Sequence, residues 1–250
     1  WYNIQADMPV KPLPPLHPVT HKPMKAENLA EIFSMECSRQ ELDTEHAWID
    51  IPEEVLDMYR YYRSTPLVRA YALEKALDTP AHIYFKNESV NPLGSHKVNS
   101  ALPQCYYCKQ EGVTNVTTET GAGQWGAALS YAAKVFGLEA AVYQVKISMQ
   151  QKPYRSLIMR AFGAMVEGSP SMSTRAGKDI VTRDPMHPGS LGTAISEAIE
   201  LARTTPRCKY TLGSVLNHVA LHQTIIGLEA EKQMAMAGEY PDKVIACFGG

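Results

Sequence analysis

An alternation between two hydrophobic patterns, which begins near residue 81, constrains the fold of this 250-residue chain most strongly. Short β-branched or aromatic runs alternate with longer amphipathic runs, and this alternation is typical of βαβ units. We expect strands near Ile83–Glu88, Asn115–Thr120, Ala140–Lys146, Met165–Gly168 and Val244–Phe248. We expect helices near His96–Glu111, Gly123–Phe136, Tyr154–Phe162, Leu191–Arg203 and Ala220–Ala237. The predicted fold class is therefore α/β, with open, mostly parallel sheets and flanking helices.

The N-terminal region is predicted to be an extended arm followed by short helices. Six prolines lie between positions 9 and 23, and each fixes φ and removes a backbone donor, which disfavours helix and sheet. Residues 26–62 are predicted to be helical in pieces. Apolar side chains of the arm would anchor it to the rest of the protein, namely Leu13, Leu16 and Val19.

The charge balance argues against two classes of partner. Lys and Arg total 24 and Asp and Glu total 26, so the net charge is −2. Such a chain has no bulk electrostatic attraction to nucleic acid or to an anionic membrane. No apolar run approaches the ~20 residues that span a bilayer. We therefore expect neither a nucleic-acid nor a membrane partner.

The five scattered cysteines favour reduced thiols and a cytoplasmic location, because a chain of this size needs no disulfides and an odd number cannot all pair. Cys105 and Cys108 form a C-x-x-C without a second pair at zinc-ligand spacing. His218 and His222 stand four residues apart on a predicted helix, but the Glu of an H-E-x-x-H motif is missing. A metal or redox role stays open at each pair, although packing is the simpler interpretation, and we predict no metal site.

The loop after the first predicted strand offers an anion site and a reactive amine. Residues 94–97 are Gly-Ser-His-Lys at a strand-to-helix turn, where helix amides, the Ser95 hydroxyl and the His96 imidazole would suit a phosphate. The helix dipole and desolvation would lower the pKa of Lys97. A neutral amine can form a Schiff base. A solvated surface lysine is the alternative.

The loop after the second predicted strand offers a cradle for a carboxylate. Glu119 ends the strand, and residues 120–126 follow as Thr-Gly-Ala-Gly-Gln-Trp-Gly. Three glycines let backbone amides approach a ligand closely. Burial would raise the pKa of Glu119 toward neutrality and suit it to acid/base catalysis. Alternatively, the loop is a nucleotide-phosphate turn and Glu119 caps a helix.

These loops and four further motifs, in the same order and spacing, resemble the β subunit of tryptophan synthase, a fold-type-II enzyme of pyridoxal phosphate. In detail the chain is similar to the second, divergent class of these subunits. It has Trp125 where the common class has His, and Leu-Gly-Ser-His-Lys at residues 93–97 where the common class has Thr-Gly-Ala-His-Lys. The motifs that carry the resemblance are residues 63–67, 86–88, 94–99, 119–124, 212–218 and 247–250.

The resemblance implies a role for each matching residue. Lys97 would hold pyridoxal phosphate as an internal aldimine and later remove the α proton of serine. Glu119 would help to expel the serine hydroxyl and stabilise the attacking indole. The cofactor-binding residues would be His96, Lys97, Gln124, Gly249 and Gly250. The substrate-binding residues would be Thr120, Gly121, Ala122, Gly123 and Gln124.

The implied reaction is a β-replacement, in which L-serine and indole give L-tryptophan and water through an aminoacrylate on the cofactor. The implied enzyme has two domains. Residues 1–62 would be an arm and helices that pack on the C-terminal domain, residues 63–205 an N-terminal α/β domain with a mobile substrate subdomain, and residues 206–250 the start of the C-terminal cofactor domain. Because the chain ends in a Gly-rich turn after a predicted buried strand, we expect it to be truncated and the second domain to be incomplete.

The resemblance also implies a homodimer and allows a monovalent cation. A tryptophan synthase α chain delivers indole in the common class, and this partnership cannot be assumed for the divergent class. One alternative function is a related pyridoxal-phosphate enzyme that uses another β-substituted amino acid or deaminates serine or threonine. The other is a non-catalytic regulatory homologue, against which the presence of both Lys97 and Glu119 argues.

Overall fold

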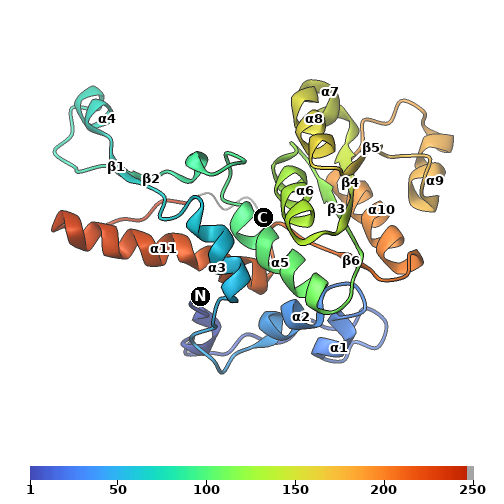
Figure 1. Ribbon diagram of the computed structural model, residues 1–250, viewed down its shortest axis with the longest axis horizontal. Helices are drawn as coiled ribbons and strands as arrows, with labels where there is room; N and C mark the ends of the chain where they lie inside the picture. Colours follow the sequence, from blue (N-terminus) through green and yellow to red (C-terminus); the bar gives the residue numbers. More distant parts are fainter. Residues whose placement is uncertain (247–250) are drawn as a thin grey trace.

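The computed structural model describes residues 1–246, and a four-stranded sheet lies in the right-hand half of the molecule as seen in Figure 1. The strands of this sheet are all parallel and follow the order β5-β4-β3-β6. A separate antiparallel pair, β1 with β2, lies toward the far end of the molecule (Figure 1). The strands are β1 Leu67–Arg69, β2 Tyr84–Lys86, β3 Asn115–Thr120, β4 Glu139–Val145, β5 Met165–Ser169 and β6 Cys208–Tyr210. The predicted α/β fold with a parallel sheet is confirmed.

Helices cover both faces of the four-stranded sheet. Figure 1 shows α6 and α8 on one side of the strands and α9 and α10 on the other. Helix α5 packs against α6 and against α11, so it connects the sheet to the long C-terminal helix. The helices are α1 Ala26–Leu29, α2 Met35–Leu42, α3 Glu53–Arg60, α4 Tyr71–Ala76, α5 Val98–Gln110, α6 Gln124–Phe136, α7 Lys146–Gln151, α8 Pro153–Ala161, α9 Arg175–Arg183, α10 Leu191–Thr204 and α11 Asn217–Ala237.

The apolar core is divided by the sheet into two clusters. One joins α5 and α6 to the strands and contains Leu102, Leu129 and Val142. The other includes Tyr143 of β4 and Tyr210 of β6, together with small side chains of α10. Strand β3 is buried from its second residue to its last, as a parallel strand covered on both faces should be.

The strand order creates a switch point beside β3. The chain steps outward from β3 to β4 and β5 and then returns, so that β6 pairs with the opposite edge of β3. In open α/β sheets, ligands bind at the carboxyl ends of the strands where the order reverses in this way. The carboxyl end of β3 carries Glu119 and Thr120, which places both residues at the switch point.

The extended arm is not anchored by the side chains that its sequence suggests. Leu13 is 91% exposed, and Leu16 and Val19 are exposed as well, so the expectation that they anchor the arm is wrong. The arm instead turns back on itself through backbone hydrogen bonds, with a bridge between Leu16 and Pro23. Ahead of the arm, the Trp1 side chain is buried, and the amino group of this residue donates to the carbonyl of Ile49 at 2.7 Å.

The predicted elements differ from the observed ones chiefly where an element is short. Strand β3 has the predicted bounds, and the helices predicted from residues 123, 154 and 191 are present within a residue or two. Strands β1 and β6 and helices α7 and α9 are not among the predicted elements. Of the strand predicted at Val244–Phe248, residues 244–246 are irregular, and the rest lies outside the described residues. Among the helices of residues 1–246, none combines the length and apolar character needed to cross a bilayer.

Candidate cofactor and substrate site

Two loops and one strand end converge at the switch point of the sheet. The first loop leads from β2 into α5. The predicted helix begins at His96, whereas in the structure Lys97 is the N-cap and the helix begins one position later. The second loop leads from β3 into α6 and is flanked by Glu119 and Gln124. The segment after β6 crosses between these two loops, because it hydrogen-bonds to residues of α5 and of β3.

Asn91 organises the lysine loop. Its amide nitrogen donates to the carbonyls of Glu88 and Ser95 at 2.6 and 2.8 Å, and its amide oxygen accepts from the backbone of Leu93 at 3.0 Å. These bonds tie both ends of the loop together. Ser95 is buried, whereas His96 is exposed at the surface of the turn. The His96 imidazole is therefore accessible to a ligand, as the phosphate-contact prediction requires.

Lys97 is half-buried, and its Nζ donates a hydrogen bond to the carbonyl oxygen of Gly213 at 3.1 Å. Burial lowers the pKa of Lys97 from its ordinary value, and the carboxyl of Glu119 partly opposes that shift. A lysine in this environment loses its proton more readily than a surface lysine. It therefore has the property that Schiff-base chemistry requires.

Glu119 lies at the carboxyl end of β3 and is only 5% exposed. Burial raises its pKa to about 7, against the hydrogen bond from Tyr210 and the nearby charge of Lys97, both of which lower it. The Tyr210 hydroxyl donates to Oε2 of Glu119 at 2.5 Å. A carboxyl with a pKa near 7 can both give and take a proton at physiological pH.

The loop from Thr120 to Gln124 is shaped by a side-chain hydrogen bond and by a glycine that no other residue can replace. The Thr120 hydroxyl accepts a hydrogen bond from the amide of Gly126 at 3.2 Å. Gly123 has a φ of +93°, and a Cβ there would lie 2.6 Å from the Cβ of Arg155. A glycine is therefore required at this position. Ala122 and Gln124 are exposed, and Gln124 begins α6, whose free N-terminal amides suit a carboxylate.

The segment 210–213, which begins with the last residue of β6, contacts both predicted catalytic residues. Tyr210 donates to Glu119, and Gly213 accepts from Lys97. The Gln104 side chain of α5 forms two hydrogen bonds with the backbone of Leu212, at 2.8 and 3.1 Å. The spacing of apolar residues did not reveal this segment, because β6 has only three residues.

The indole ring of Trp125 packs directly against Gly213, in the space that a side chain at position 213 would need. A Cβ on Gly213 would lie 2.4 Å from Cδ2 of the indole ring. The Trp125 Nε1 donates to the Thr118 hydroxyl at 2.7 Å, and that hydroxyl donates to the carbonyl of Thr211 at 2.6 Å. The residue that distinguishes the divergent class in the sequence therefore supports the backbone that receives Lys97.

A buried ionic cluster lies at the back of the lysine loop. Arg63, with a side chain only 4% exposed, forms paired hydrogen bonds with Glu88 and with Glu229 of α11. Lys86 donates to Glu229 at 2.7 Å, and Asn99 of α5 donates to Glu88 at 3.1 Å. The positive charges of the two cations equal the negative charges of the two carboxylates, so the cluster is neutral overall. The motifs around residues 63 and 86 thus connect the lysine loop to α11.

The histidine pair is held by hydrogen bonds to other side chains, and the cysteine pair is buried in a helix. His222 is fully buried, and its ring nitrogens lie 3.1 Å from the Ser100 hydroxyl and 2.9 Å from the amide oxygen of Gln40. His218 Nδ1 lies 2.9 Å from Glu41. Cys105 and Cys108 are buried on α5 as free thiols, and burial raises the pKa of both. Within residues 1–246, no cluster of three such side chains could hold a metal ion.

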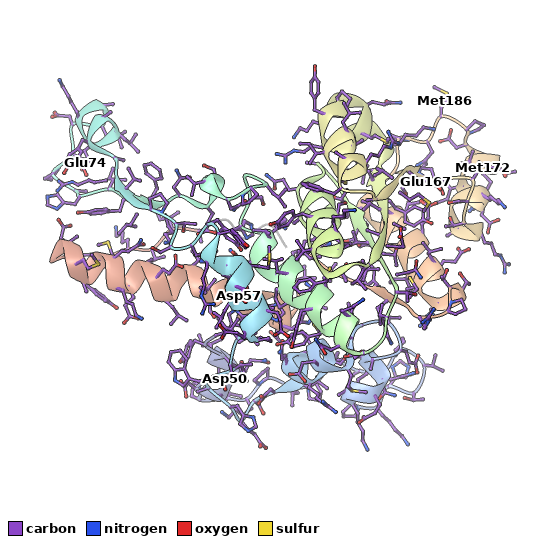
Figure 2. All side chains as sticks on the ribbon, viewed as in Figure 1. Asp50, Asp57, Glu74, Glu167, Met172 and Met186 are labelled. Atoms are coloured by element: carbon purple, nitrogen blue, oxygen red, sulfur yellow. The ribbon has the colours of Figure 1, made fainter. Side chains whose placement is uncertain are left out.

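A cavity of about 680 Å³ lies apart from these loops, between α7, α8 and the end of β5. Figure 2 labels two of its lining residues, Glu167 and Met172, at the edge of the sheet near α9. Its lining comes from residues 146–172 and excludes Lys97 and Glu119. Gly249 and Gly250, the predicted start of a phosphate loop, lie outside the described residues.

Comparison with known proteins agrees with this geometry. A family model described as "Pyridoxal-phosphate dependent enzyme" matches residues 58–250, which is most of the chain. The chain belongs to this family. Its cofactor is accordingly pyridoxal phosphate, and the half-buried amine of Lys97 beside an accessible His96 fits that group chemically.

Curated relatives within the family cover the whole chain. "Tryptophan synthase beta chain 2" of Thermotoga maritima is 56% identical over 250 residues, and those of Aquifex aeolicus and Methanosarcina mazei are 55% and 53% identical. The chain spans only 59%, 57% and 56% of the length of these three relatives. The resemblance to the second class of β chains is confirmed by these names.

Two solved structures share the fold at low sequence identity. A diaminopropionate ammonia lyase of Escherichia coli in apo form superimposes with a TM-score of 0.59 at 17% identity, over 75% of this chain and 52% of that one. A fungal L-serine ammonia-lyase from Rhizomucor miehei gives 0.52 at 21% identity, over 69% and 47%. Both confirm the α/β architecture of the family.

Proposed function

We propose that the protein containing this chain is a tryptophan synthase of the β type, which joins L-serine and indole to give L-tryptophan and water. The observation that carries the proposal is the placement of Glu119, a buried carboxyl with a pKa near 7, beside Lys97 at the switch point. The names of the curated relatives support the same reaction. Bound pyridoxal phosphate supplies an electron sink for the carbanion chemistry.

The proposed role of Lys97 is to hold the cofactor and to take the α proton of serine on Nζ. Its lowered pKa favours the neutral amine, which can accept a proton. His96 and Gln124, together with Gly249 and Gly250, are proposed to hold the cofactor with it. The hydrogen bond to Gly213 keeps Nζ directed toward the segment after β6 when the amine is free.

The proposed role of Glu119 is to protonate the serine hydroxyl as it leaves as water, and then to accept the proton released when indole adds. A pKa of about 7 suits both directions of transfer. The substrate carboxylate is proposed to bind the backbone amides of Gly121, Ala122 and Gly123, with Thr120 and Gln124 at the ends of the loop. Separate groups would then bind the substrate and move protons.

The wider assignments rest on the resemblance. We propose that the protein is a homodimer in the cytoplasm. We also propose that residues 1–62 form the N-terminal arm and helices, residues 63–205 the N-terminal domain, and residues 206–250 the start of the C-terminal domain. A monovalent cation is proposed as a further ligand. An α chain is a candidate source of the indole. Measurement of tryptophan formation with and without an α chain tests this partnership.

The test uses the natural protein that contains this sequence, loaded with pyridoxal phosphate and supplied with serine and indole. Glu119→Ala should retain the cofactor absorbance and bind serine, but tryptophan formation should fall by about 10²–10⁴-fold, as expected for losing a general acid/base. The matched control is Glu139→Ala, which removes an exposed carboxyl at the start of β4 and should behave as wild type.

Two other outcomes would contradict the proposal. If the wild-type protein converts serine to pyruvate and ammonia but forms no tryptophan with indole, the alternative of serine deamination replaces it. If the protein binds no cofactor at all, it is a non-catalytic homologue. Normal tryptophan formation by Glu119→Ala would leave the reaction assigned but remove Glu119 from the mechanism.

A further inference from the structure

We propose that Tyr210 is a positioning residue for Glu119, which holds one carboxylate oxygen and leaves the other to exchange protons with the substrate. The inference rests on the proposed function and adds a residue to it. Tyr210 lies outside the motifs that suggested the site, and it comes from a strand that the sequence pattern did not predict.

The position of Tyr210 follows from the register of the sheet. In the pairing of β3 with β6, Tyr210 stands opposite Thr117. Side chains alternate across a strand, so Glu119, two residues further along β3, lies on the same face as Thr117. Tyr210 and Glu119 are thus diagonal cross-strand neighbours, within reach of a long side chain. The hydroxyl reaches Oε2 of Glu119 at 2.5 Å.

Tyr210 is itself held in place by a backbone hydrogen bond and by ring packing. Its backbone amide donates to the carbonyl of Ile32 at 2.8 Å, and its ring packs against Phe33 with the ring centroids 5.6 Å apart. The residue is 3% exposed. Burial and the nearby Glu119 raise the pKa of Tyr210 well above its ordinary value, so the hydroxyl remains protonated and donates at every working pH.

The hydrogen bond has two consequences for Glu119. It occupies Oε2, so the exchangeable proton is assigned to Oε1. It also favours the ionised carboxylate and lowers the pKa of Glu119, against the effect of burial. Lys97, at the start of α5, acts in the same direction. Another buried carboxylate, Glu197 of α10, accepts instead from Ser171 and Thr174.

The test is Tyr210→Phe in the natural holoenzyme, with tryptophan formation measured from pH 5.5 to 9. The variant keeps the ring that packs on Phe33 and removes only the hydroxyl. We expect kcat to fall roughly 10- to 100-fold, the effect of losing a hydrogen bond to a charged group. The KM for serine should change little, because the loop that precedes α6 binds the substrate. The apparent pKa assigned to Glu119 should move to higher pH, since burial is then less opposed.

The matched control is Tyr143→Phe. Tyr143 of β4 is 1% exposed and stands opposite Glu119 in the register of β3 with β4. It is a buried tyrosine on the strand that flanks β3 on the other side. Removal of its hydroxyl should leave the pH profile of tryptophan formation unchanged. An equal shift in both variants would overturn the inference, because the effect would then come from general loosening of the sheet.

A second measurement separates positioning from folding. In a Glu119→Gln background, removal of the Tyr210 hydroxyl should cost little further activity, because the two residues act through one group. Equal losses in the wild-type and Glu119→Gln backgrounds would show a purely structural role and overturn the inference. A wild-type enzyme that makes no tryptophan would instead remove the proposed function, so the two failures are distinguishable.

Discussion

The Nζ of Lys97 donates to the carbonyl oxygen of Gly213 at 3.1 Å, although the two residues are 116 positions apart in the sequence. Gly213 lies three residues after Tyr210, which donates to Glu119. The last residue of β6 and the short segment that follows it therefore contact both residues proposed to move protons. A change in this segment should affect cofactor attachment and proton transfer together.

Lys97 should be the residue that carries the cofactor. Reduction of the natural holoenzyme with borohydride, followed by peptide mapping, should place the label on Lys97. Lys86 is the nearest alternative in the sequence, but its amine is already paired with Glu229 at 2.7 Å. Label on Lys86 or on Lys109, with Lys97 unmodified, would contradict the assignment.

Gly213→Ala should displace the carbonyl that receives Lys97. The new methyl group would lie 2.4 Å from the Trp125 ring, so the segment or the ring has to shift. We expect a loss of about 1–3 kcal/mol in the free energy of unfolding, as for overpacking elsewhere, together with weaker cofactor binding by absorbance titration. The control is Gly227→Ala on α11, where a Cβ meets nothing within 4 Å and stability should rise slightly.

A double variant tests whether contact with the Trp125 ring causes the Gly213→Ala defect. Adding Trp125→Leu removes the ring that the methyl group would meet, so the double variant should bind the cofactor better than Gly213→Ala alone. No improvement would show that the defect comes from the backbone of Gly213 and not from the contact with Trp125.

The buried ionic cluster should be sensitive to loss of its central cation. Arg63→Met leaves Glu88 and Glu229 without their guanidinium partner, and removing one member of a buried pair costs about 3–5 kcal/mol. Urea unfolding of the natural protein measures the change. Arg60→Met is the comparison, because the Arg60 side chain forms ion pairs although it is 63% exposed. Its loss should lower the free energy of unfolding by less than ~1 kcal/mol. Equal costs would mean that the cluster is not effectively buried.

The raised pKa of Glu119 should be visible in stability as well as in activity. Its ordinary value is 4.5 and its folded value about 7, so the folded protein retains a proton that the unfolded chain releases between these pH values. The contribution of Glu119 to the free energy of unfolding is therefore fully present below pH 4.5 and is lost as the pH rises toward 7. The loss is up to about 3 kcal/mol, at ~1.4 kcal/mol per pKa unit.

Glu119→Gln removes this linkage. The variant should therefore gain stability relative to wild type when urea unfolding at pH 8 is compared with unfolding at pH 5. Glu139→Gln, at an exposed position, should show no such difference. A pH-independent difference between Glu119→Gln and wild type would mean that Glu119 ionises near its ordinary pKa.

Much of the sheet could be predicted because its inner strands are marked by local composition. Strand β3 is six residues long, with β-branched and buried positions almost throughout, and its predicted bounds are the observed ones. Lys97 ends the glycine-containing loop that follows β2, and Glu119 lies near the end of β3, just before a second glycine-containing loop. Their placement at strand-to-helix junctions could therefore be predicted too.

The partners of these two residues could not be predicted, because they depend on tertiary pairing. Strand β6 has only three residues, too few for a hydrophobic pattern to reveal. Tyr210 therefore resembles any other aromatic residue until β6 is placed beside β3. The prediction that apolar side chains anchor the arm is wrong for a related reason. An apolar side chain such as Leu13 does not indicate by itself whether another surface covers it.

The return of β6 to the edge of β3 has a consequence for the order of folding events. Glu119 and Tyr210 are separated by 91 residues, so their contact closes a large loop and depends on non-local pairing, which forms slowly. During synthesis, the lysine turn and the β3 turn leave the ribosome well before β6 does. The reactive centre is thus completed only when the intervening strands and helices have docked, and a chain arrested before β6 would contain Lys97 and Glu119 without the segment that aligns them.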